Sequence, residues 1–169
     1  MKLIASLTDE DVGEKPVPVD KFVDRKAVRA VIFDKDGRVA VMKVAKDGVY
    51  KVPGGGLDEG ESLIDALERE VREESGATIK NIKELGRIVE QRTVYPLRQE
   101  SFCYTADVVS VGETSFTENE KKAGFSVLWM STEDAIKAFE SVVPKKYKAK
   151  FIAKREFLIL KEAINKRKI

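Results

Sequence analysis

Three glutamates of this chain, Glu70, Glu73 and Glu74, are spaced so that their carboxylates could hold a metal ion. In a helix, residues three and four positions apart lie on the same side, so these carboxylates would be neighbours. Like charges this close repel one another unless a cation lies between them, and Mg²⁺ prefers oxygen ligands. A glycine-rich turn, residues 53–56, precedes them, and its backbone can approach a ligand closely. The combination indicates metal-assisted chemistry on phosphate groups.

A solvated helix face with ion pairs is the alternative interpretation of these glutamates, and helical phase argues against it. At about 100° per residue, four apolar residues define one arc of the helix: Leu63, Ile64, Leu67 and Val71. Glu74 falls inside this arc, Glu70 falls at its edge, and Glu73 lies further round. An ionised carboxylate among core-facing positions needs a partner or a metal. Arg69 can pair with Glu73, but the negative excess on this segment persists.

Composition indicates one globular domain with a sizeable core. The chain has 169 residues, of which 43% are hydrophobic and 36% are charged. The formal net charge of +2 does not call for a nucleic-acid duplex or an anionic membrane as partner. We find neither an apolar run long enough to span a bilayer nor the apolar region of a signal peptide, so we expect a cytoplasmic protein.

The side chains that are missing exclude several kinds of catalytic site. The chain has no histidine, so it cannot form a Ser-His-Asp triad, a Cys-His dyad or a His-ligated zinc site. Cys103 is the only cysteine, so no disulfide can form within the chain, and we interpret it as a small core residue rather than a nucleophile. Catalysis near neutral pH must therefore use carboxylates, lysine, tyrosine or metal-bound water.

Strands and helices that would position these residues can be assigned from periodicity and turn residues. Ser62 is a candidate N-cap and Gly76 a candidate C-terminal residue for the helix that carries the glutamates, residues 63–75. Alternation and β-branched residues predict strands over 27–34, 38–44, 49–52, 82–94, 101–111 and 125–130. Further helices are expected over 132–141 and 145–166, with a loop over 112–124. The predicted class is α/β with a mixed sheet, as a single domain over 27–169 that follows an N-terminal extension, 1–26.

At this point residues 55–77 resemble the Nudix box, G-x5-E-x7-R-E-U-x-E-E-x-G-U, where U is an apolar residue. Its positions are filled by Gly55, Glu61, Arg69, Glu70, Val71, Glu73, Glu74, Gly76 and Ala77. Ala77 is smaller than the usual final residue. The resemblance extends from about Ala27 to Ser141 in the order of strands and helices. It implies the Nudix fold, an α/β/α sandwich around a mixed sheet, and hydrolysis of a nucleoside diphosphate linked to another group, with Mg²⁺ or Mn²⁺ as cofactor.

The resemblance also implies roles for the residues of the box. Glu70, Glu73 and Glu74 would hold Mg²⁺ against the phosphate oxygens, and the ion would lower the pKa of a bound water. Arg69 would orient one of these carboxylates. Glu61 would act either through a water-mediated metal contact or by fixing the loop. The three glycines Gly54, Gly55 and Gly56 would shape the turn that meets the substrate.

Residues outside the box complete the candidate site. Many family members use a further glutamate as metal ligand or general base, and Glu120 is the favoured candidate here, with Glu118 close behind. An ordinary solvated loop is the alternative for both. Tyr50 could line a base pocket or simply pack in the core. Arg92, Tyr95, Arg98 and Gln99 could contact the substrate from the loop after the box, unless that loop is merely exposed.

The box indicates the type of reaction but does not identify the substrate. We expect a MutT-like enzyme that converts a nucleoside triphosphate or an oxidised one to the monophosphate and pyrophosphate. ADP-ribose, nucleotide sugars and dinucleoside polyphosphates are alternatives. Tyr95 has the spacing from the box that the resemblance implies for dinucleoside polyphosphate hydrolases, which is weak support, whereas Pro96 lies further from the box than the proline of ADP-ribose hydrolases. A non-catalytic nucleotide-sensing module is a third possibility, although such modules commonly have a degraded box. An isoprenoid diphosphate isomerase is excluded, because the chain lacks the histidine that such enzymes use. A homodimer is compatible with the sequence.

Overall fold

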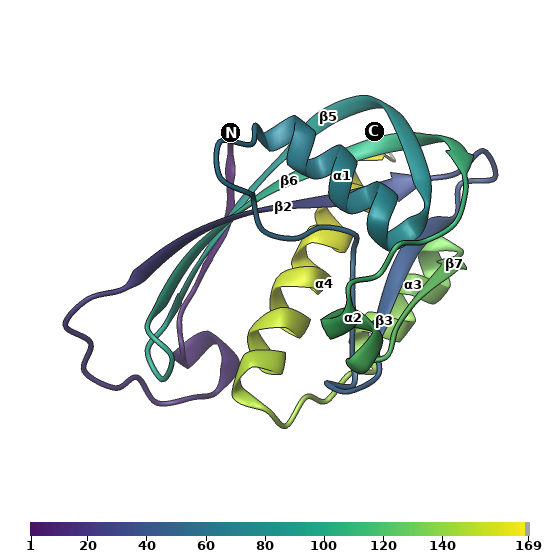
Figure 1. The fold of residues 1–169 in the computed structure, drawn as a ribbon. Helices are drawn as coiled ribbons and strands as arrows, with labels where there is room; N and C mark the ends of the chain where they lie inside the picture. Colours follow the sequence, from purple (N-terminus) through teal and green to yellow (C-terminus); the bar gives the residue numbers. More distant parts are fainter. Residues whose placement is uncertain (168–169) are drawn as a thin grey trace.

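A mixed sheet of seven strands lies at the centre of the protein, and helices cover both of its faces (Figure 1). The computed structural model describes residues 1–167. The strand order is β1-β5-β6-β2-β3-β4, with β7 on the other edge of β3. The strands are β1 (Leu3–Leu7), β2 (Val23–Phe33), β3 (Val39–Val44), β4 (Val49–Lys51), β5 (Ala77–Arg92), β6 (Leu97–Val111) and β7 (Phe125–Met130). The predicted α/β class with a mixed sheet is confirmed.

Strand β2 is the centre of the sheet and positions the glycine loop. It pairs in parallel with β6 along its whole length but pairs with β3 only at Phe33 and Val39. The loop that follows β4 uses the backbone edge that β3 leaves free. The Val28 N–H donates to the Gly55 carbonyl, and the Ala30 N–H donates to the Pro53 carbonyl, both at 2.9 Å. The loop is therefore held by main-chain hydrogen bonds along a central strand.

Helix α1 (Leu63–Ser75) covers one face of the sheet and has the predicted bounds. The Asp65 N–H donates to the Ser62 hydroxyl, so Ser62 is the N-cap, and Gly76 ends the helix at φ 71°. Leu67 and Val71 are fully buried against the strands. Ile64, placed by helical phase in the same apolar arc, is 41% exposed, so the arc that meets the sheet is narrower than the sequence predicts.

Helices α3 (Thr132–Glu140) and α4 (Tyr147–Arg167) cover the opposite face, where α4 crosses beneath the sheet (Figure 1). Phe151 and Leu160 of α4 pack with Phe139 of α3 in the larger core cluster. Two charged residues of α4, Arg155 and Glu156, are also buried. The helix therefore carries an ionic group, in addition to apolar side chains, into the interior.

Several elements differ from the sequence prediction. Residues 112–124, expected as a loop, contain the short helix α2 (Glu118–Lys122), because one turn and a half of helix is too short to show a periodic pattern. Strands β2, β5 and β6 each begin four or five residues earlier than predicted, with exposed polar residues on their free faces. The segment 1–26 contributes β1, which pairs in parallel with β5 at the edge of the sheet, and the short helix Glu10–Val12. Within residues 1–167, no helix is both long enough and apolar enough to span a membrane.

Truncation of two leucine-sized residues of α1 tests which face of the helix carries the packing energy. Leu67→Ala should lower the free energy of unfolding by about 2–5 kcal/mol, because it opens a cavity at a fully buried position. Ile64→Ala should lower it by less than about 1 kcal/mol, because Ile64 is largely exposed. Urea denaturation of both variants measures the difference. Equal losses would contradict the orientation of α1.

Candidate active site

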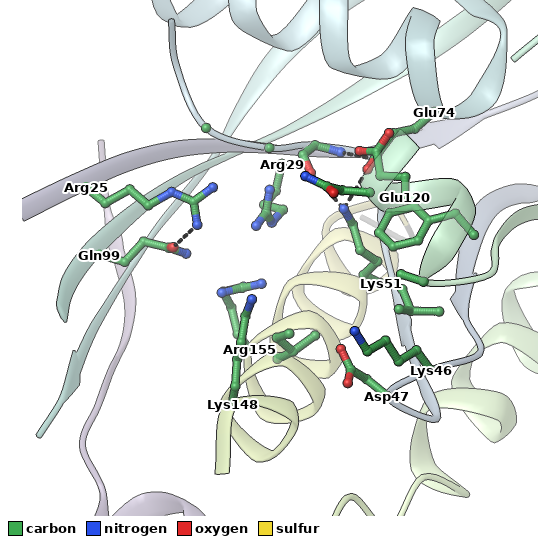
Figure 2. A pocket seen from close by; sticks show the side chains of 18 of the residues that line it. Arg25, Arg29, Lys46, Asp47, Lys51, Glu74, Gln99, Glu120, Lys148 and Arg155 are labelled. Carbon is green, nitrogen blue, oxygen red and sulfur yellow. Dashed lines mark hydrogen bonds and ion pairs between the residues drawn. The ribbon is translucent and has the colours of Figure 1, made fainter. Parts of the chain in front are cut away.

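One cavity of about 820 Å³ lies between the glycine loop, α1, the β5–β6 turn, α2 and α4 (Figure 2). This volume lies within the range of small-molecule sites, about 300–1,000 Å³. Four carboxylates and eight lysine or arginine side chains are among the residues that line it. Glu74 and Glu120 lie at one end, with Lys51 beside them, and Arg25 and Lys148 lie at the other.

Glu74 is the most deeply placed carboxylate of the acidic end. It is only 1% exposed. Its Oε2 accepts from the Gly54 N–H at 2.8 Å, and its Oε1 accepts from Lys51 Nζ at 2.7 Å. Burial raises the pKa of the Glu74 carboxyl, and the ammonium group of Lys51 opposes that rise. Lys51 therefore serves as the counter-ion of Glu74 in this structure.

Two glycines allow the loop to lie against its neighbours. Gly54 adopts φ 144°, and a Cβ there would lie 2.9 Å from the Arg29 Cα and would overlap the Val28 carbonyl. A Cβ on Gly55 would lie 2.5 Å from Oε2 of Glu70. Real Cβ atoms do not approach other atoms so closely, so a side chain at either position would displace the strand or the carboxylate. Gly54, Gly55 and the two carboxylates Glu70 and Glu74 thus form a single packed unit.

Arg69 connects the loop to the helix from the side away from the cavity. Its guanidinium group binds both oxygens of Glu61 at 2.8 Å and donates to the Gly56 carbonyl at 3.1 Å. It also donates to Glu70 at 2.9 Å, which orients that carboxylate. Glu61 in turn accepts from the Asp58 N–H at 2.9 Å. Two roles were expected for Glu61, and these contacts match the one in which it fixes the loop.

The fit of a divalent metal can be judged from the donor set. Among residues 1–167 no three acidic, cysteine or histidine side chains are gathered closely enough to hold an ion as they stand. Glu74 is occupied by Lys51, and Glu73, which lies outside the cavity lining, pairs with Arg69 at 3.4 Å. Glu70 and Glu74 nevertheless face one cavity beside the Gly54 carbonyl, and all these donors are hard oxygens, as Mg²⁺ prefers. The residues fit a divalent cation that competes with Lys51 for Glu74.

The residues expected outside the box divide into two groups. Arg92 and Gln99 line the cavity, as do Tyr95 and Glu120. Glu120 also caps α2, where its Oε2 accepts from the Thr117 N–H at 2.8 Å. Glu118 does not line the cavity and pairs with Lys121 on the surface at 2.8 Å.

Strand alternation explains why two expected residues lie elsewhere. Arg98 was expected in a loop, but β6 begins at Leu97, so Arg98 and Gln99 point to opposite faces of the sheet. Gln99 faces the cavity, while Arg98 pairs with Asp24 at 2.6 Å on the other face. Tyr50 likewise neighbours Lys51 in β4 and stacks on Phe139 in the core, with ring centroids 6.0 Å apart. The packing role of Tyr50, one of the two alternatives, matches its position.

A buried ionic network that the sequence analysis missed forms the wall opposite α1. Glu156 accepts from Arg29 at 3.1 Å, from Arg155 at 2.6 Å and from the Val52 N–H at 3.0 Å. Glu90 accepts from Arg92 at 2.8 Å and from Arg155 at 2.6 Å. Burial alone would raise the pKa of both carboxyls, but the arginines hold each pKa below its usual value. The network joins α4 to β2, β5 and the start of the glycine loop.

Two sequence signals could have revealed this network. Arg29 is the one charged residue within an otherwise apolar stretch of β2, residues 27–33. Arg155 and Glu156 fall in the same helical phase as the apolar residues Phe151 and Ile159, which is the test that identified Glu74.

Comparison with known proteins places this geometry in a family. The NUDIX domain model matches residues 23–151. The chain is 37% identical over 86 residues to an RNA pyrophosphohydrolase of Bartonella tribocorum, which covers 45% of this chain and 47% of the relative. It is 44% identical over 52 residues to the 8-oxo-dGDP phosphatase NUDT18 of Danio rerio, 29% of this chain and 16% of the relative. The chain thus spans less than half the length of these curated relatives.

A solved structure agrees with the fold. The NUDIX domain of Shewanella oneidensis NrtR, complexed with ADP ribose, superposes with a TM-score of 0.62 over 86% of this chain and 90% of that chain. The two sequences are 18% identical, so this likeness concerns the fold. It agrees with the α/β/α arrangement of the sheet and helices.

The stabilisation that the Arg69–Glu61 ion pair contributes should depend on pH. The hydrogen bonds from Arg69, and then the Asp58 N–H, lower the pKa of Glu61 from an ordinary 4.5 to about 2. Because the folded-state pKa is the lower one, the stabilisation from this pair is complete above about pH 4.5 and is lost as the pH falls towards 2. Carboxyl-carbon NMR titration should give the low value in the wild type and a clearly higher value in Arg69→Met, still below 4.5 because the Asp58 N–H continues to donate to Glu61. An unchanged Glu61 pKa in that variant would contradict the assignment.

Proposed function

Because the chain belongs to the NUDIX family, we propose that it is a pyrophosphohydrolase that uses Mg²⁺, or Mn²⁺ in its place. The proposed substrates are nucleoside triphosphates, unmodified or oxidised, which it converts to the monophosphate and pyrophosphate. One observation carries this proposal: two carboxylates in a glycine cradle, Glu70 and Glu74, face a wall of arginine and lysine across a single cavity. Such a site offers a metal ion to one part of a phosphate chain and fixed positive charge to another part.

The residues at the acidic end would have different roles in the proposed reaction. Glu70 and Glu74 would hold the divalent ion, which when bound neutralises phosphate charge and lowers the pKa of a water. Arg69 holds Glu70 in position through its hydrogen bond at 2.9 Å. Lys51, once the ion takes its place at Glu74, would be free to contact a phosphate oxygen of the substrate. The Gly54 N–H, in the buried loop backbone, holds the Glu74 carboxylate in place at 2.8 Å.

The choice of substrate is supported by charge. Of the cationic side chains that line the cavity, Arg25, Lys46 and Lys148 take part in no ion pair found within residues 1–167. A triphosphate has more negative charge for them to balance than a diphosphate sugar has. Relatives named for RNA pyrophosphohydrolase and 8-oxo-dGDP phosphatase activity are compatible with this choice. ADP-ribose, nucleotide sugars and dinucleoside polyphosphates form the second candidate class, since the NrtR domain is complexed with ADP ribose. A nucleotide-sensing module without catalysis is the alternative of another class.

Removal of one carboxylate tests the metal end directly. Glu70→Gln should lower kcat/KM for Mg²⁺-dependent pyrophosphate release by roughly 100-fold or more, because it removes a charged oxygen donor next to the scissile bond. The assay would cover unmodified and oxidised nucleoside triphosphates, ADP-ribose, nucleotide sugars and diadenosine polyphosphates, each with and without metal.

Glu68→Gln is the matched control, since Glu68 belongs to the same helix but does not line the cavity. It should retain activity within about threefold, as expected of a surface change. Wild-type protein that hydrolyses none of these substrates with Mg²⁺ or Mn²⁺ would contradict the proposed enzyme and favour the nucleotide-sensing module.

Glu120 can be tested separately from its role in the cap of α2. Glutamine at this position can still accept from the Thr117 N–H, so Glu120→Gln should unfold at the wild-type urea concentration. If Glu120 is a metal ligand or general base, the same variant should lose about tenfold or more in kcat/KM. Glu118→Gln should lose neither stability nor activity. Wild-type activity in Glu120→Gln would limit this residue to the cap.

A further inference from the structure

The end of the cavity opposite Glu74 is lined by positive charge from three elements. Arg25 comes from β2, Arg92 from β5 and Lys148 from the first turn of α4. Figure 2 shows Arg25 and Lys148 at the end of the cavity away from Glu74 and Glu120, with Arg29 between Arg25 and Glu74. We call Arg25, Arg92 and Lys148 the basic end of the cavity.

Arg92 adds a largely buried guanidinium group to this end. The residue is only 5% exposed, and its guanidinium group donates to Glu90 at 2.8 Å and lies over the ring of Phe151. Its Nε is buried and has no hydrogen-bond partner among the described residues. Protein atoms already cover this nitrogen, so Arg92 acts on the cavity through the positive charge of its guanidinium group.

The carboxylates near the basic end are already shared by other groups. Glu90 accepts from Arg92, Arg155 and the Gln99 amide, and Glu156 accepts from Arg29, Arg155 and the Val52 N–H. Arg25 donates to the Gln99 amide oxygen at 3.1 Å, which carries no charge. Lys148 takes part in none of the ion pairs found within residues 1–167. Positive charge therefore exceeds negative charge here.

Repulsion among these cations contributes to a lowered pKa for two of them. Desolvation lowers the pKa of Lys148, and the nearby charge of Arg92 lowers it further. Asp47 opposes this shift, and Arg25 and Arg155 add smaller lowering effects. Desolvation, followed by Arg29, Arg155 and Arg92, likewise lowers the pKa of Arg25. A bound anion would relieve this repulsion. Phosphate suits the site best, because guanidinium groups match the geometry of its oxygens and an ammonium group adds a point charge.

We propose that Arg25, Arg92 and Lys148 form a metal-independent phosphate subsite, which binds a phosphate group of the substrate beyond the group held at Glu70 and Glu74. This inference rests on the proposed function and deepens it. The enzyme would then select substrates with phosphate at both ends of the cavity, such as nucleoside and dinucleoside polyphosphates. ADP-ribose and nucleotide sugars place an uncharged sugar beyond their diphosphate and would leave the basic end unsatisfied.

Pyrophosphate binding in the presence of EDTA tests the subsite without the metal. Titration calorimetry at low ionic strength should detect binding to the wild type, and Lys148→Ala should weaken it by about tenfold, the loss expected for one charged hydrogen bond. Lys154→Ala is the matched control, because Lys154 is an exposed lysine of the same helix outside the cavity. It should bind pyrophosphate as the wild type does. Arg25→Ala provides a second variant from a different element and should weaken binding similarly.

A kinetic measurement distinguishes a phosphate of the substrate from free phosphate. With Mg²⁺ present, the ratio of kcat/KM for dATP to that for ADP-ribose should fall by about tenfold in Lys148→Ala and stay constant in Lys154→Ala. Lys148-dependent pyrophosphate binding with an unchanged ratio would overturn the assignment to substrate. Absence of Lys148-dependent binding in EDTA would overturn the subsite, even where Glu70-dependent hydrolysis persists. Loss of all hydrolysis with intact Lys148-dependent binding would overturn the proposed function alone.

Discussion

The close approach of the glycine loop to β2 and α1 is the constraint on which the site depends. Gly54 lies against the backbone of β2 at a distance that excludes a side chain, and Gly55 lies so close to the carboxylate of Glu70 that a side chain there would displace it. This approach lets the Gly54 N–H reach Glu74, which would otherwise be a buried carboxylate with Lys51 as its only partner. The loop and the helix thus hold each other, and the acidic end of the cavity is rigid before any ligand arrives.

Part of the positive charge that lines the cavity is neutralised by buried carboxylates in the wall opposite α1. Glu90 and Glu156 are fully buried and hold three arginines between them, which makes the wall opposite α1 stiff. Removing either carboxylate would leave buried guanidinium groups unpaired, a costly state in a low-dielectric interior. Charge left over from this network, at Arg25 and Lys148, is what makes the far end of the cavity attractive to an anion.

Helix α4 is part of the site although it follows the box by some seventy residues. Glu156 accepts from the Val52 N–H at the start of the glycine loop, while Lys148, two turns earlier, lies at the basic end. One helix therefore contacts the loop that holds the acidic end and itself carries Lys148 of the basic end. Movement of α4 relative to the sheet would alter both ends of the cavity together.

The sequence by itself determined the family, the bounds of α1 and the burial of Glu70 and Glu74, because these follow from local spacing and helical phase. It also determined the absence of histidine chemistry. Only the tertiary structure decided that Gln99 faces the cavity and Arg98 does not, since the start of β6 sets the alternation. It alone brought Arg25, Arg92 and Lys148 together, because contacts across more than fifty residues depend on strand register and helix packing, which leave no periodic signal in the sequence.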